Sequence, residues 1–144
     1  MHEYWADVEL EETLEFGSYE VTREEIVEFA GRYDPQTFHL DEEAAAESMF
    51  GGLVASGWHT AAMTMRLIVD NYLSESGAVG SPGVEDLRWP APVRPGDTLR
   101  VRSVPIEREP WSEDLGLVKT ETTTLNQDDV AVQEQTARVL YPRR

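Results

Sequence analysis

The sequence contains no cysteine, a single lysine and no long apolar run. Without cysteine the chain has no disulfide, no thiolate nucleophile and no iron–sulfur cluster, and nothing in it favours an oxidising compartment. No apolar stretch approaches the roughly 20 residues that span a membrane. The chain begins with the acidic segment MHEYWADVEL, whereas a secretory signal begins with positive charge. We therefore expect a cytoplasmic protein without a membrane role.

Cationic side chains are also scarce: 12 lysines and arginines stand against 28 acidic residues, which gives a formal net charge of −16. A surface this negative repels phosphate backbones and anionic lipids, so it argues against nucleic-acid binding. With Lys119 as its single lysine, the composition resembles that of proteins from a salt-loaded cytoplasm, where ionic strength screens self-repulsion. That habitat is a hypothesis, which a salt series can test.

The length of 144 residues suits one domain with one core, and a hydrophobic content of 40% is too high for a disordered chain. We find no internal repeat, no low-complexity segment and no linker long enough to separate two domains. The prediction is a single domain over residues 1–144, with its core in about residues 20–141.

The first helix is predicted over residues 23–33. Thr22 and Glu25 form a capping box, in which the threonine hydroxyl accepts from an orphan backbone N–H and the glutamate reaches back. Apolar residues then recur at helical spacing: Ile26, Phe29, Ala30 and Tyr33. Pro35 ends the helix, because it disfavours helical geometry at the preceding residue. Asp34 is thereby placed where a loop begins.

A second, short helix is predicted from its cap Asp41 to about Met49, and a long helix from Gly57 to about Leu73. Apolar residues cover the long helix almost all round, which predicts that a sheet surrounds it. Alternating patterns predict strands over residues 14–21, 84–90, 97–109, 116–126 and 130–141, with turns at 94–97 and 126–129. This order of elements indicates an α+β domain whose antiparallel sheet wraps one long helix.

The sequence holds no phosphate-binding loop or dinucleotide fingerprint, so any chemistry falls to ordinary side chains. Asp34 and His39 are five positions apart between the first two helices, and a carboxylate and an imidazole so placed can converge on one water molecule. Simpler explanations exist for single residues: aspartate before proline forms turns, Ser56 suits a helix cap, and His59 suits the core. A metal site of these histidines with the acids at 41–43 is a weaker alternative, because their spacing suits caps better than ligands.

Two longer segments carry a family resemblance. Residues 29–41, FAGRYDPQTFHLD, and residues 50–59, FGGLVASGWH, together resemble the MaoC-like dehydratases, the (R)-specific enoyl-CoA hydratase group. The segment PVRPGDTL at 92–99 is similar to the strand-linking turn of the same group. The resemblance extends over about residues 20–140.

The resemblance implies a hot-dog fold, in which a sheet surrounds one long helix, and so agrees with the independent prediction above. It also implies an enzyme that adds water to a trans-2-enoyl-CoA thioester to give an (R)-3-hydroxyacyl-CoA, or removes it, without a cofactor or metal. Asp34 and His39 match the family's catalytic pair, and Gly57 matches the position whose backbone N–H polarises the thioester carbonyl. The other residues expected beside the substrate are Phe50, Ser56 and Trp58.

The chain departs from the usual pattern of the group. Proline follows Asp34 directly, and Gln36 stands where asparagine is usual. Ser56 replaces the usual histidine before the glycine, and His59 has no counterpart. These departures predict a subgroup with its own acyl specificity.

Two alternative functions stay open at this stage: a hot-dog thioesterase, which would attack the carbonyl, and a non-catalytic MaoC-like subunit that binds acyl thioesters. Coenzyme A is the expected carrier, since an acidic carrier protein would be repelled by this surface. A homodimer at least is expected, because a single open sheet leaves edges uncovered and family members pair two units into one sheet.

Overall fold

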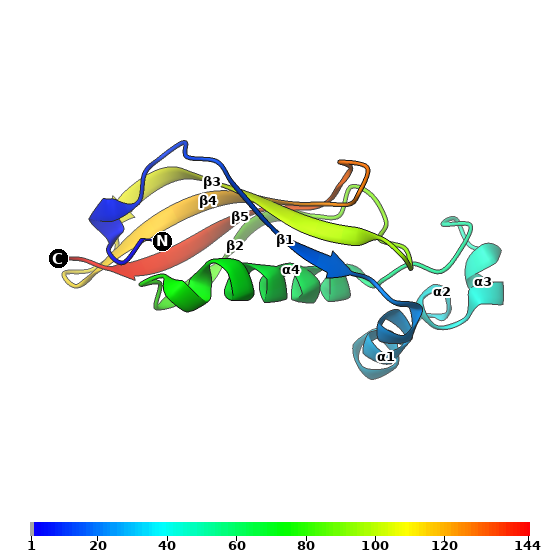
Figure 1. The fold of residues 1–144 in the computed structure, drawn as a ribbon. Coiled ribbons are helices and arrows are strands. Elements are labelled where there is room, and N and C mark those ends of the chain that lie inside the picture. Colours follow the sequence, from blue (N-terminus) through cyan, green and yellow to red (C-terminus); the bar gives the residue numbers. More distant parts are fainter. Residues whose placement is uncertain (1) are drawn as a thin grey trace.

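The computed structural model describes residues 2–144. Its five strands form one antiparallel sheet in the order β1-β3-β4-β5-β2. The strands are β1 (Leu14–Glu20), β2 (Gly80–Arg88), β3 (Thr98–Pro110), β4 (Leu115–Leu125) and β5 (Ala131–Pro142). The sheet curves over helix α4 (Gly57–Asn71), which runs along its concave face (Figure 1). The predicted α+β arrangement, a long helix wrapped by an antiparallel sheet, is therefore confirmed.

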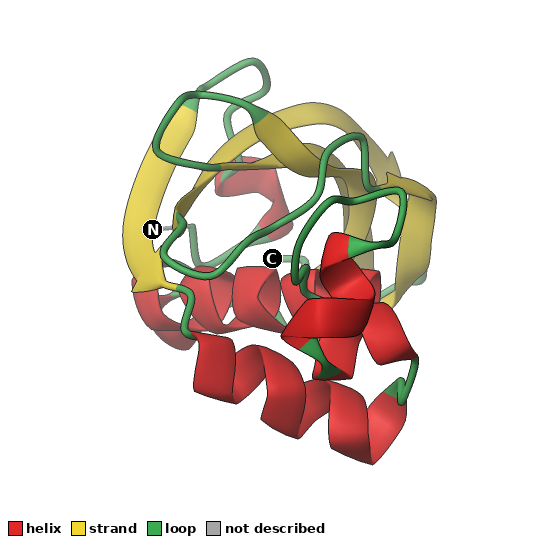
Figure 2. Ribbon diagram, turned by 90° about the vertical axis from the view of Figure 1, so that its right-hand side faces the viewer, coloured by secondary structure: helices red, strands yellow, loops and turns green. Residues whose placement is uncertain are grey.

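The short helices gather at the end of the molecule where α4 begins (Figures 1 and 2). They are α1 (Arg23–Tyr33), α2 (Thr37–Leu40) and α3 (Glu42–Ala46), whereas the single-turn helices η1 (Trp5–Asp7) and η2 (Leu73–Glu75) lie elsewhere. Both ends of the described chain lie at the opposite end of the sheet (Figure 1). The segment between α1 and α4 is thus held over the first turn of the long helix.

The core lies between the sheet and the inner side of α4. It includes several side chains that are at most 4% exposed: Ile26, Met63, Leu67, Leu99, Val101 and Val132. Within this layer Thr64 and Thr124 share a buried hydrogen bond of 2.7 Å, so the polar atoms that face each other across it are satisfied. Gly17 lets β1 approach the helix, because a Cβ at that position would lie 2.7 Å from Leu67 Cδ2.

The prediction that α4 is buried nearly all round is wrong. Trp58, Met65 and Val69 are 59%, 49% and 38% exposed. The reason is geometric: one sheet covers only one side of a helix, so the other apolar side faces outward. Tyr33, which the helical pattern assigned to the buried face of α1, is 66% exposed for a similar reason, since it stands at the free end of its helix.

The predicted helix ends are right in part. The Thr22 hydroxyl accepts from the Glu25 backbone N–H at 3.2 Å, as a capping box requires, but the Glu25 carboxylate accepts from the Tyr19 hydroxyl. Asp41 caps α3 through the Glu43 N–H at 2.9 Å, yet this helix ends at Ala46 and not near Met49. The sequence pattern also missed α2, a single turn whose Gln36 cap lacks a side-chain bond.

Candidate active site

Asp34 lies where α1 ends, and its own backbone N–H closes the last turn by donating to the Ala30 carbonyl at 2.8 Å. Its φ of −151° and ψ of 68° turn the chain out of the helix, as Pro35 requires of the residue before it. The predicted loop start at Asp34 is thus confirmed. The carboxylate is held toward the first turn of α4.

His39 is on α2 and is 5% exposed. Its Nδ1 lies 2.7 Å from the Val54 carbonyl oxygen. Because a carbonyl only accepts, Nδ1 carries a proton, and Nε2 lies on the opposite side of the ring. That Nε2 lies 3.3 Å from Asp34 Oδ2, so the two predicted side chains do meet.

Asp34 accepts hydrogen bonds on both carboxylate oxygens. Gln36 Nε2 donates to Oδ1 at 2.6 Å, and the Ser56 hydroxyl donates to Oδ2 at 2.7 Å. Burial acts to raise the pKa of Asp34, but these two bonds, together with the nearby imidazole of His39, outweigh it and hold the pKa below its ordinary value. The carboxyl is therefore ionised at neutral pH, with two donors that fix its orientation.

Ser56 is the N-cap residue of α4, as its position suggests, but its side chain does not cap the helix. Its side chain makes no capping bond to α4, because the hydroxyl is used by Asp34. The Ser56 carbonyl accepts from the backbone N–H groups of His59 and Thr60, both at 3.0 Å, so the helix begins directly after it. Gly57 follows Ser56 directly and begins α4. A small residue and a helix N-terminus therefore lie on the same side as Asp34.

A cavity of about 660 Å³ opens at this point. Asp34, His39 and Gly57 all line it. The other predicted substrate residues line it as well: Phe50, Ser56 and Trp58. Trp89 and Arg94 complete the wall; Arg94 Nη2 is anchored by the Phe50 carbonyl at 2.6 Å.

Sequence reasoning missed four contributors to this cavity. They are the orienting carbonyl of Val54, the amide of Gln36, the indole of Trp89 and the guanidinium of Arg94. For Gln36, proximity in sequence to Asp34 was an available signal. Nothing in the sequence brings position 89 near position 57, because the two meet only when β2 closes over α4.

His59 stays outside the acid–base pair. It is 4% exposed and stacks on Phe29 with a centroid separation of 4.7 Å and an interplanar angle of 9°. Burial lowers its pKa, and the charge of Glu25 offsets this in part. Among the described residues Nδ1 of His59 has no hydrogen-bond partner, so this is a core histidine with a desolvated nitrogen.

Residues 2–144 contain neither a metal-binding cluster nor a helix that could span a membrane. No three histidine, aspartate or glutamate side chains of this part of the chain are grouped so as to hold a metal ion. Nor does any helix within the same range combine the length and apolarity of a membrane span.

Comparisons with known proteins place the chain in a family. Residues 7–127 match the family model described as a MaoC like domain. A crystal structure of a MaoC-like dehydratase from Rhodospirillum rubrum superposes with a TM-score of 0.90 at 43% identity, covering 98% of this chain and 97% of that one. The uncharacterized protein YdeM of Bacillus subtilis is 31% identical over 126 residues, which is 88% of this chain and 89% of that protein.

A relative with a named activity matches over a shorter stretch. The 3-hydroxyacyl-thioester dehydratase Z of Mycobacterium tuberculosis is 35% identical over 85 residues, which is 58% of this chain and 56% of that protein. An (R)-hydratase from Pseudomonas aeruginosa shares the fold, with a TM-score of 0.77 at 24% identity. The chain, with its hot-dog sheet and its matched sequence, belongs to the MaoC-like domain family.

Proposed function

We propose that the protein is a hydratase or dehydratase of trans-2-enoyl-CoA thioesters, with (R)-3-hydroxyacyl-CoA as the hydrated form. The observation that carries the proposal is the 3.3 Å approach of His39 Nε2 to Asp34 Oδ2 in a cavity that also contains the N-terminus of α4. The family membership supports the reaction class.

The pair suits the activation of one water molecule. The carboxylate oxygen is an acceptor, and Nε2 is one as well whenever it carries no proton, so a water that donates one proton to each can bridge the pair. Such a water turns its own lone pairs toward the cavity. One of the two groups takes its proton as it adds to C3 of the enoyl chain, and the proton is returned at C2.

The thioester oxygen needs stabilisation as negative charge reaches it during this addition. The backbone N–H of Gly57 stands at the start of the 15-residue helix α4, where unpaired N–H groups and the helix dipole favour negative charge. One donor of this kind contributes on the order of 3 kcal/mol in other enzymes. Arg94 in the wall of the same cavity supplies positive charge suited to an anionic carrier such as coenzyme A.

The assay that tests the proposal uses crotonyl-CoA. Loss of the enone absorbance without release of free thiol is the expected result, whereas thiol release would indicate the thioesterase alternative. Asp34→Asn and His39→Gln should each lower kcat/KM by about 10²–10⁴-fold, the usual contribution of a positioned acid or base. Near-parental turnover by either folded variant would refute the mechanism, and inactivity of the parent protein would favour the non-catalytic subunit.

A homodimer is the proposed assembly. Apolar side chains on the outer side of α4 and on the edge strand β2 are exposed: Trp58, Met65, Val69 and Val84. A second copy of the chain would cover them and continue the sheet at its open edge. Sedimentation velocity at micromolar concentration tests this, and an active monomer would contradict it.

A further inference from the structure

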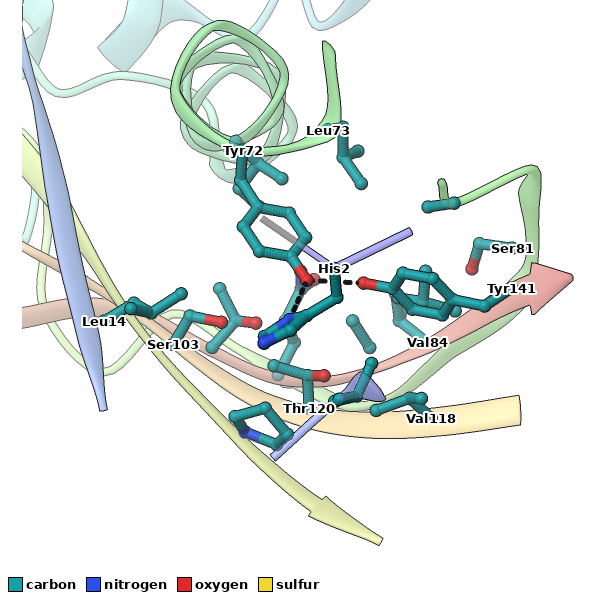
Figure 3. Close-up of a pocket in the computed structure, with 18 of the residues that line it drawn as sticks. His2, Leu14, Tyr72, Leu73, Ser81, Val84, Ser103, Val118, Thr120 and Tyr141 are labelled. Carbon is teal, nitrogen blue, oxygen red and sulfur yellow. Dashed lines mark hydrogen bonds between the residues drawn. The ribbon is translucent and has the colours of Figure 1, made fainter. Parts of the chain in front are cut away.

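A second cavity, of about 310 Å³, lies between the C-terminal half of α4 and the concave face of the sheet (Figure 3). Its apolar lining includes Val8, Phe16, Met65, Ile68, Val118 and Val139. This volume is at the lower end of the roughly 300–1,000 Å³ of ligand sites, and engineered apolar cavities of about 150 Å³ already bind benzene. The space is large enough for a small apolar molecule.

The second cavity is separate from the candidate active site. Among the described residues none lines both cavities. The buried hydrogen bond between Thr64 and Thr124 ties helix to sheet between them. Met65 and Val84, which line the second cavity, are about half exposed in the single chain, and the proposed second copy would cover them.

A chain of hydrogen bonds lies within this cavity, whose lining also includes the polar side chains of Ser81, Ser103, Thr120, Thr122 and Gln135. The hydroxyls of Tyr72 and Tyr141 are 2.6 Å apart, and His2 Nδ1 lies 3.1 Å from the Tyr72 hydroxyl. Figure 3 shows the three groups pointing toward one another inside the cavity. Tyr141 is 3% exposed, so its hydroxyl is a buried polar group.

The N-terminal segment holds His2 in this position. The His2 carbonyl accepts from the Gly77 backbone N–H at 2.8 Å. Trp5 packs onto Gly116, where a Cβ would lie 2.2 Å from its ring, and its Nε1 donates to the Leu117 carbonyl at 3.0 Å. The polar end of the cavity is therefore built by packing and does not depend on a free terminus.

The hydrogen-bond chain leaves capacity at Tyr141. If Tyr141 donates to Tyr72, and Tyr72 to His2, an acceptor site remains on the Tyr141 oxygen. If the direction is reversed, the Tyr141 O–H itself remains free to donate. Within residues 2–144 Tyr72 is the hydrogen-bond partner of this hydroxyl, so a ligand group that can both donate and accept would suit either direction.

The charges around the cavity select against an anion. Burial raises the pKa of Tyr72 and of Tyr141, so both are neutral hydroxyls at neutral pH. Glu12 lines the cavity, with its carboxylate 3.6 Å from His2 Nε2. A ligand carboxylate would meet this like charge, whereas a neutral oxygen would not.

We propose that this cavity is a second ligand site, which takes a compact apolar skeleton bearing one neutral hydroxyl group, hydrogen-bonded to Tyr141. Two sources offer this chemistry: a free alcohol or phenol, and the far end of an oxygenated acyl chain that reaches in from the active site of a second copy.

The first arm of the test uses 2-naphthol, with naphthalene as the probe that lacks the oxygen. We expect 2-naphthol to bind more tightly by about 3–10-fold, as one neutral hydrogen bond would give. Methyl NMR should place the shifts on Ile68, Val84 and Val118. Tyr141→Phe keeps the ring and should remove the preference for 2-naphthol, while Tyr33→Phe, at an exposed tyrosine outside the cavity, should keep it.

Equal binding of the two probes by the parent protein would overturn the proposal, and so would methyl shifts outside the cavity. That comparison requires no variant, so it holds even if a substitution impairs folding.

The second arm distinguishes the sources. It compares hydration of trans-2-octenoyl-CoA with that of its 8-hydroxy derivative by the parent and by Tyr141→Phe. A preference for the hydroxylated substrate that is lost in the variant identifies the acyl chain; equal kcat/KM values identify a free ligand. Failure of the parent to hydrate crotonyl-CoA would refute the proposed function and leave the naphthol result standing.

Discussion

The indole of Trp89 occupies the space in which a side chain at position 57 would lie. A Cβ on Gly57 would come within 2.5 Å of Trp89 Cδ2. The ring is fixed there, because Nε1 donates to the fully buried Gln133 at 2.9 Å and Trp58 packs against it at 80°. The family resemblance assigns Gly57 a backbone N–H that polarises the thioester carbonyl, and the structure adds an aromatic wall that requires a small residue at this position.

Gly57→Ala should therefore destabilise the fold by about 1–3 kcal/mol, as overpacking does. In a Gly57→Ala background, Trp89→Leu should recover part of that loss, because it removes the atoms in conflict. Urea unfolding measures both. Gly31→Ala is the matched control: its nearest contact would be 3.9 Å, within a helix, so stability should hold or rise. Equal losses at positions 31 and 57 would contradict the packing argument.

Ser56→Ala should raise the pKa of Asp34, because it removes one of the two hydrogen bonds that favour the carboxylate. The acid limb of the kcat/KM profile should then move to higher pH. A lowered pKa of Asp34 also stabilises the folded state at pH values above the ordinary pKa of 3.8, and this stabilisation is lost as pH falls through the pKa of the folded state. Because the folded-state pKa is higher in the variant, the variant should lose the stabilisation at a higher pH. A pH series of rates and of urea unfolding measures both effects, with Ser112→Ala, in a distant turn, as the control. An unchanged acid limb would show that the serine does not set the charge of Asp34.

His59→Phe should flatten the dependence of stability on pH between 7.5 and 5.5. The folded pKa of His59 lies below 6.5, so the unfolded chain binds more protons in this window and the parent loses stability as pH falls from 6.5 toward the folded value. The slope can reach about 1.4 kcal/mol per pH unit for one group. Phenylalanine keeps the stack on Phe29 and cannot titrate. If stability changed with pH equally in the parent and the variant, a group other than His59 would cause the pH dependence.

Added salt should raise the free energy of unfolding. The net charge of −16 makes the folded chain repel itself, and the Debye length falls from about 10 Å at 0.1 M to about 3 Å at 1 M. Urea titrations at 0.1 and 1 M NaCl measure the change, and sucrose controls for general exclusion effects. Full stability at low salt, with no gain on addition, would remove the salt-adapted interpretation of the composition.

The predictable parts of the fold were those with a local signal. The alternation in the sequence predicts strands over residues 116–126 and 130–141, and the structure has the paired strands Leu115–Leu125 and Ala131–Pro142 within one residue of those bounds. Pro35 and Thr22 fix the ends of α1 through backbone geometry and capping alone. The extent of α4 is right, but which of its sides lies open depends on how far the sheet reaches around it, and that is not a local property.

The candidate site, like the fold, has parts that the local sequence predicts and parts that it does not. Asp34 and His39 are close in sequence, so their meeting is predictable from residue types and spacing. The role of Ser56 is not, because its local environment suits a helix cap and only the docking of α4 brings the hydroxyl to Asp34. Trp89 reaches Gly57 through the closure of β2 and carries no signal in the chain near either residue.

The proton on His39 is positioned by main chain. Since the Val54 carbonyl belongs to the backbone, any amino acid at position 54 supplies the same acceptor. The side chain of Val54, which is 2% exposed, is therefore constrained by packing and not by the tautomer of His39. The contact with His39 instead requires that the segment from Phe50 to Ser56 keep its path. It therefore constrains the length of this loop more than the identity of the residue at position 54.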